Sequence, residues 1–195
     1  MIREADSLNP GPWVRHSWFT ACAAQAIARH HPRLDPETAF VLGYLHDIGR
    51  RAGKTDMRHT LDGFRFLKAI GFDDAARICI THVFPIKDIH SVAGKWDCSD
   101  TEMDFLIEFL ERTEFDEYDR LIQLCDALAL PTGICRIEKR LLDVDSRYGI
   151  NSYSIPRRDA FLRIQKEMET SIGQSVYRVF SVGLGNSCEF NPDPP

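Results

Sequence analysis

Apolar residues recur at intervals of three and four along almost the whole chain, and sustained alternation at period two is absent. The first interval matches the turn of an α-helix, whereas alternation marks a half-buried strand. The pattern therefore predicts an all-α fold, a bundle of helices. A chain of 195 residues that is 44% hydrophobic can bury one sizeable core, which predicts a single domain.

Capping and breaking residues place the helix ends. Asp35 is the predicted N-cap of one helix, with Pro36 at its first position, and Gly49 is the predicted C-cap. Ser99 and Glu102 have the spacing of a capping box. The predicted helices span about 12–30, 36–49, 59–70, 73–83, 101–112, 116–130, 134–148 and 156–172. We expect a core of about 12–173, with flexible ends at 1–10 and 183–195.

Charge and cysteine usage narrow the class of protein. The net charge of −5 argues against a general binder of nucleic acids or membrane surfaces, although small basic islands at 50–51, 136–140 and 157–158 could hold a small anion. The six cysteines form no CxxC pair, which favours reduced thiols and a cytoplasmic location. We expect neither a signal peptide nor a membrane span. The oligomeric state is left open.

Several polar residues lie in apolar surroundings. In "LGYLHDIGR", His46 and Asp47 follow an apolar helix flank, and in "LIQLCDALAL", Asp126 is surrounded by apolar residues. A buried carboxylate needs a partner. Each residue taken singly has an ordinary explanation, such as an ion pair between Asp47 and Arg50 at a helix end. The order of the candidates is more specific: His16, His46-Asp47, His59, His82 and Asp126.

In this order and spacing the chain resembles the HD-domain metal-dependent phosphohydrolase superfamily over about residues 12–131. The matching segments are "VRHSWFTACAAQAIA", "LGYLHDIGR", "MRHTLDGFRFLKAIGF", "ARICITHVFP" and "LIQLCDALAL". The resemblance implies an HD-domain helical bundle whose pocket holds one or two metal ions. His16, His46, Asp47 and Asp126 match the ligands shared across the superfamily. His59 and His82 match the extra pair of its two-metal branch, in which Asp47 would bridge the ions.

The donor set agrees with that implication. Imidazole and carboxylate ligands without thiolate suit Fe, Mn, Co or Ni better than a closed structural zinc site. We therefore expect two divalent ions, Fe or Mn first, with Co, Ni or Mg as alternatives. Bound metal generates hydroxide and polarises phosphoryl oxygens, so the predicted reaction is phosphoester or phosphoanhydride hydrolysis. Asp47 is the expected catalytic residue, and Arg50 and Lys54 are the expected phosphate-binding residues.

The substrate is less specified than the chemistry. The chain lacks the glycine-tyrosine-proline signature of the branch that hydrolyses cyclic dinucleotides, because "VFPIKDIH" follows His82. It is similar in length and ligand order to the dinucleoside polyphosphate hydrolases of the superfamily. We expect a nucleotide, a dinucleotide or a related small phosphate ester as substrate. Two alternatives remain: an HD-fold di-iron oxygenase, and a non-catalytic nucleotide-binding protein. The irregular segment 84–100 is a candidate lid over the pocket.

Overall fold

A computed structural model of the protein describes residues 1–183 and confirms the all-α prediction. The α-helices are α1 (Ile2–Leu8), α2 (Trp13–Ala28), α3 (Pro36–Leu45), α4 (His59–Ala69), α5 (Asp73–Thr81), α6 (Asp100–Arg112), α7 (Glu117–Asp126), α8 (Ile137–Tyr148), α9 (Ser154–Ile172) and α10 (Val176–Gly183). Two 3-10 helices are η1 (Ile48–Ala52) and η2 (Ile89–Ser91), and a two-stranded antiparallel hairpin joins β1 (Ala129–Leu130) to β2 (Gly133–Ile134). The tail at 184–195, where the sequence predicts flexibility, lies outside the described residues.

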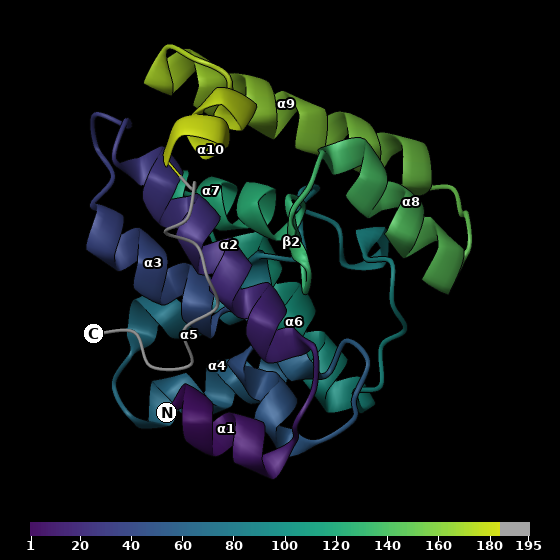
Figure 1. Ribbon diagram of the computed structural model, residues 1–195. Coiled ribbons are helices and arrows are strands. Elements are labelled where there is room, and N and C mark those ends of the chain that lie inside the picture. Colours follow the sequence, from purple (N-terminus) through teal and green to yellow (C-terminus); the bar gives the residue numbers. More distant parts are fainter. Residues whose placement is uncertain (184–195) are drawn as a thin grey trace.

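Helix α2 runs through the middle of the bundle and packs against α3, α7 and the hairpin (Figure 1). Helix α4 packs against α5 and η1, and α5 in turn packs against α3 and α7. Helix α9 lies across the top of the view, with α8 descending beside it and α1 at the bottom. Helices distant in the sequence therefore surround one end of α2.

The core consists of two hydrophobic clusters. The larger surrounds α2 and includes Trp18, Ile27, Leu45 and Ile122. The smaller joins α4, α5, α6 and the irregular segment between α5 and α6, through side chains that include Leu61, Ile80, Phe84 and Leu106. Phe84 is fully buried and stacks on Trp96, whose indole N–H donates to the carbonyl of Ile89 at 2.9 Å. The candidate lid is thus packed onto the core.

Two predicted helix starts are confirmed at atomic detail. The Asp35 carboxylate accepts the backbone N–H of Thr38 at 2.7 Å, with Pro36 at the first helical position. Ser99 and Glu102 form the predicted capping box at the start of α6. Each such cap satisfies a backbone N–H that the helix leaves open and stabilises it by about 1 kcal/mol.

The ends of two helices differ from the sequence prediction. Helix α3 ends at Leu45, four residues before Gly49, and η1 follows, so His46 and Asp47 lie in the junction between them. Helix α7 ends at Asp126 instead of about residue 130, because Ala129–Leu130 pair with the strand that follows. In both places the helix ends at, or just before, a predicted metal ligand.

Gly49 allows η1 to lie directly against α4. A Cβ built at Gly49 would lie 1.9 Å from the carbonyl oxygen of His59 and 2.4 Å from the backbone nitrogen of Gly63. The backbones of η1 and α4 therefore touch directly, which only glycine permits. This contact fixes the start of α4 next to the residues that follow α3.

We expect Gly49→Ala to destabilise the protein by about 3 kcal/mol, since overpacking against backbone cannot be relieved by a side-chain rotation. Urea denaturation of the metal-free protein measures the change. Ala52→Gly, at an exposed position of the same 3-10 helix, is the control, with an expected cost of at most about 1 kcal/mol. Equal stability of the two variants would show that the backbone contact is not close.

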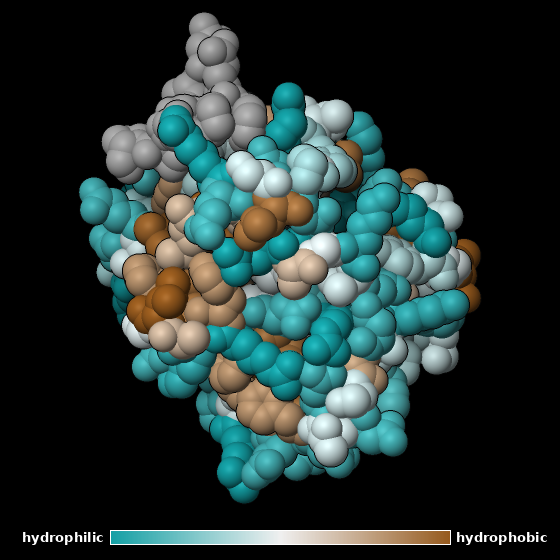
Figure 2. Space-filling model, turned by 90° about the horizontal axis from the view of Figure 1, so that it is seen from below, coloured by the Kyte–Doolittle hydropathy of each residue, from teal (hydrophilic) through white to brown (hydrophobic). Residues whose placement is uncertain are grey.

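Within residues 1–183, every helix is too short or too polar to cross a membrane. The face shown in Figure 2 is largely hydrophilic, with apolar surface gathered in separate patches. Helices α1 and α10 are not predicted by the sequence analysis. In α1, Ile2 and Ala5 are buried against the core, so this segment is held in place although it is only seven residues long.

Candidate metal centre

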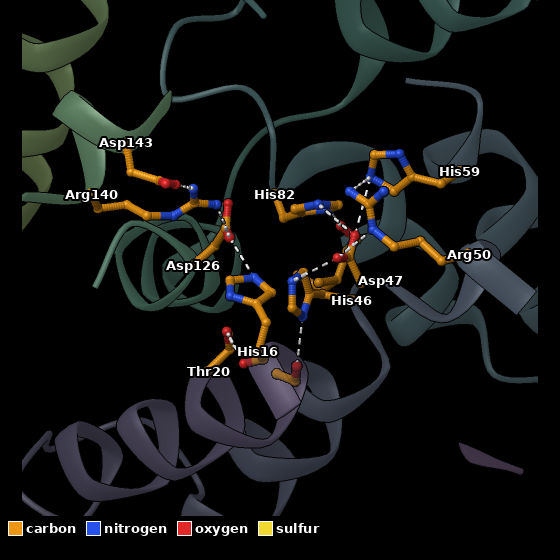
Figure 3. A network of polar contacts seen from close by, with 12 residues as sticks. His16, Thr20, His46, Asp47, Arg50, His59, His82, Asp126, Arg140 and Asp143 are labelled. Atoms are coloured by element: carbon orange, nitrogen blue, oxygen red, sulfur yellow. Dashed lines mark hydrogen bonds and ion pairs between the residues drawn. The ribbon is translucent and has the colours of Figure 1, made fainter. Parts of the chain in front are cut away.

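The structure brings six polar residues to one place between the helices (Figure 3). They come from five places in the fold: the first half of α2, the junction after α3, which supplies two of them, the start of α4, the residue after α5 and the end of α7. The residues are His16, His46, Asp47, His59, His82 and Asp126. Five of the six are buried, and Asp126 is partly exposed.

Three of the imidazoles are oriented by backbone carbonyls. The Nδ1 atoms of His46, His59 and His82 lie 2.7, 2.5 and 3.0 Å from the carbonyl oxygens of Gly43, Asp56 and Ile78. A carbonyl only accepts hydrogen bonds, so the facing Nδ1 carries the proton. The Nε2 atom of each ring is left with a lone pair, which is the state in which histidine binds a metal.

These lone pairs face the carboxylate of Asp47. Its Oδ1 lies 3.1 Å from His59 Nε2 and 3.8 Å from His82 Nε2, and its Oδ2 lies 3.9 Å from His46 Nε2. Asp47 Oδ1 and His46 Nε2 are buried without a hydrogen-bond partner among the described residues. Buried acceptors that face one another are costly unless a cation lies between them. The residues present therefore fit a metal ion.

His16 and Asp126 extend the centre on the other side of His46. His16 Nε2 lies 2.8 Å from Asp126 Oδ1, and the rings of His16 and His46 are 5.2 Å apart. Ligand atoms of His16, His46 and Asp126 all lie within 4.8 Å of one another, as do those of His46, Asp47 and His82. The two groups share His46, whose single free nitrogen can bind one ion, and His59 adjoins the second group through Asp47.

The protonation states also suit a cation. Burial lowers the pKa of His82 to about 3 and lowers the pKa of His46. Burial opposes ionisation of Asp47, yet the charge of Arg50 and the neighbouring histidines hold the pKa of that carboxyl well below its usual range. Burial also opposes ionisation of Asp126, but its contact with His16 and the charge of Arg140 together lower its pKa. At neutral pH these groups are bare imidazoles and ionised carboxylates, as metal binding requires.

A cavity of about 570 Å³ opens onto the centre, and the two cations expected to bind phosphate line it. Arg50 is half-buried and donates from Nε to Asp47 Oδ2 at 2.7 Å, with Nη2 3.4 Å from His59 Nε2. Lys54 is exposed and makes no ion pair with any residue from 1 to 183. Arg50 is therefore held by the centre itself, whereas Lys54 keeps its donors for a ligand.

Sequence reasoning placed Arg140 in a basic island but did not connect that island with this site. Arg140 of α8 lines the same cavity and places Nη2 3.7 Å from Asp126 Oδ1. In Figure 3 it lies on the side of Asp126, with Arg50 on the side of Asp47 and with His16, His46 and His82 between them. The available signal was the helical register of Arg140, Asp143 and Arg147, which puts all three on one face.

Comparisons with known proteins agree with this geometry. Neither curated proteins nor solved structures gave a significant match. The family model of the HD domain matches residues 13–130, which include all six residues of the centre and more than half of the chain. The chain therefore belongs to the HD domain family.

Proposed function

We propose that this protein is a metal-dependent phosphohydrolase that cleaves a nucleotide, a dinucleotide or a related small phosphate ester with the help of two divalent ions, Fe or Mn first. The observation that carries the proposal is the Asp47 carboxylate, which is buried, faces imidazole lone pairs and borders a cavity lined by cations. Together with buried cysteines outside any disulfide at Cys79 and Cys125, this function is consistent with a cytoplasmic protein.

The residues divide into two roles. When bound, such ions lower the pKa of bound water and polarise phosphoryl oxygens. His16, His46, Asp47, His59, His82 and Asp126 would hold the ions, with Asp47 as the carboxylate expected to serve both of them. Arg50 fixes the orientation of Asp47 through its 2.7 Å hydrogen bond and presents its remaining N–H groups to the cavity edge near His59. Lys54 binds a phosphate oxygen as a point charge.

The test is a screen of the Mn- or Fe-loaded protein against nucleotides, dinucleoside polyphosphates and simple phosphomonoesters, with phosphate or nucleotide release as the readout. We expect hydrolysis that is lost on chelation and proceeds without oxygen. Turnover that requires both iron and oxygen would instead identify a di-iron oxygenase. Nucleotide binding with no turnover under any metal would identify a non-catalytic binding protein.

Lys54→Ala should raise KM about 10-fold with kcat little changed, because a charged hydrogen bond that is equal in ground and transition state contributes to binding alone. Steady-state kinetics on the best substrate of the screen measure both constants. Lys68→Ala is the matched control, since Lys68 is an exposed lysine of α4 that pairs with Asp73 outside the cavity. A fall in kcat with unchanged KM would place Lys54 in the chemical step instead.

A further inference from the structure

One wall of the cavity comes from outside the segment that matches the family model. The matched residues end at 130, whereas α8 and α9 begin at Ile137 and Ser154. These two helices contribute Arg140, Arg147 and Arg157 to the lining of the cavity that also contains His16, Asp47 and Asp126. The fold thus places three guanidinium groups opposite the proposed metal ligands.

Two of these arginines are held together by a single acceptor. Arg140 donates to Asp143 Oδ2 at 3.0 Å and Arg147 donates to the same oxygen at 2.8 Å. One carboxylate therefore balances two positive charges, apart from the 3.7 Å approach of Arg140 to Asp126. The Nε of Arg140 is buried and has no hydrogen-bond partner among residues 1–183. Donor capacity and charge both exceed what the surrounding chain satisfies.

The third arginine is the most buried of the set. Arg157 is 5% exposed, donates to the carbonyl oxygen of Ser91 at 2.9 Å, and has its nearest carboxylate, Asp145, at 3.8 Å. Burial lowers the pKa of Arg157, because the nearby charge is too distant to offset desolvation. A guanidinium that is buried, lines a cavity and has a distant counter-ion is stabilised by an anion that enters the cavity.

The cavity lining carries a net positive charge, whereas the whole protein carries a net negative charge. The cavity is lined by five cations, Arg50, Lys54, Arg140, Arg147 and Arg157, and by three carboxylates, Asp47, Asp126 and Asp143. Five positive and three negative charges leave +2, whereas the chain as a whole carries −5. Metal ions would add further positive charge, so a singly anionic ligand would leave most of it unbalanced.

We propose that Arg140, Arg147 and Arg157 form a second anion subsite, which binds a phosphoryl group of the ligand other than the one at the metal centre. The proposal rests on the proposed function and specifies its substrate as a compound with at least two linked phosphoryl groups. Guanidinium groups suit this role because their planar forks donate two hydrogen bonds to a tetrahedral oxyanion. Arg147 is the best residue for a test, since it is nearly half exposed and its loss leaves Asp143 paired with Arg140.

The experiment compares two hydrolysis-resistant probes, methylphosphonate and methylenediphosphonate, by calorimetry on the metal-loaded protein under nitrogen at fixed ionic strength. Wild type should bind the diphosphonate at least about 10-fold more tightly than the monophosphonate. Arg147→Gln should remove about 10-fold of that preference, equivalent to about 1.4 kcal/mol, and leave methylphosphonate affinity within about twofold. Metal content after each titration checks that the probes do not strip the ions.

Arg158→Gln is the matched control, because Arg158 is an exposed arginine of α9 that pairs with Asp159 and does not line the cavity. Its affinities should equal those of wild type. An unchanged preference in Arg147→Gln, or an equal loss for both probes, would overturn the subsite. If the preference depends on Arg147 but no phosphate compound is hydrolysed, the subsite stands and the proposed hydrolase function fails. If phosphate compounds are hydrolysed but the preference does not depend on Arg147, the hydrolase function stands and the subsite fails.

Discussion

Asp47→Asn should lower kcat by on the order of 10³-fold or more, because the proposed nucleophile is generated by metal ions that this carboxylate holds. Asparagine keeps the shape of the side chain and removes its charge. The carboxylate contacts both sides of the centre, with Oδ1 near His59 and His82 and Oδ2 near His46 and Arg50. Phosphate release and metal content on the same preparation measure the effect, and both should fall.

Turnover and metal content, measured beside the melting temperature, separate this account from the structural one. Asp47 also accepts a hydrogen bond from Arg50, so a purely structural role is a real alternative. In the metal-free protein, an asparagine amide could donate to a bare imidazole nitrogen such as His59 Nε2, so stability should change by no more than about 1 kcal/mol. Near-normal turnover with full metal content would remove Asp47 from the mechanism, whatever the melting temperature.

The helical fold could be predicted because its signals are local. Two helix starts are marked by capping residues, which form hydrogen bonds to residues three positions away. These residues are Asp35, followed by Pro36, and Ser99 with Glu102. Both partners of such a contact lie within a few residues of each other, so the contact can be predicted from the local sequence. The spans of α4, α5 and α6 follow in the same way from periodic apolar residues and adjacent breakers.

The errors lie where distant contacts decide the backbone. Gly49 has the properties of a C-cap, but its lack of a side chain serves the contact with His59 and Gly63 in α4. Likewise, the pairing of Ala129 with Ile134 ends α7 early, although Ala127–Leu130 alone are good helix formers. These tertiary contacts override local propensity, and periodicity does not reveal them.

In the candidate metal centre, too, the residue identities could be predicted from the sequence, whereas the geometry depends on distant contacts. Its six residues could be named from the sequence, because their order and spacing resemble those of the HD-domain superfamily. Their mutual distances could not, since these depend on how α2, α5 and α7 pack. Arg140 was named only as part of a basic island, because a basic residue in a charged helix resembles a solvated surface residue until the fold turns α8 towards the cavity.

The number of ions is tested by His59 and His82, which the structure places together around Asp47 Oδ1. We expect the double variant His59→Ala/His82→Ala to bind about half the metal of wild type and to lose activity on the order of 10²-fold, because one ion alone cannot clamp both attacking and leaving oxygens. The remaining ion should be held by His16, His46 and Asp126, whose ligand atoms form a separate group.

The matched control is His90→Ala, since His90 is an exposed histidine of η2 that does not line the cavity. Metal analysis of dialysed protein and phosphate release should leave this control at the wild-type level. A double variant with full metal and full activity would mean that the two histidines only support the backbone through their Nδ1 contacts with Asp56 and Ile78. A variant with no metal at all would mean that the ions bind as one cooperative unit, because the two groups share His46. Half occupancy is the result that assigns His59 and His82 to one ion of a pair.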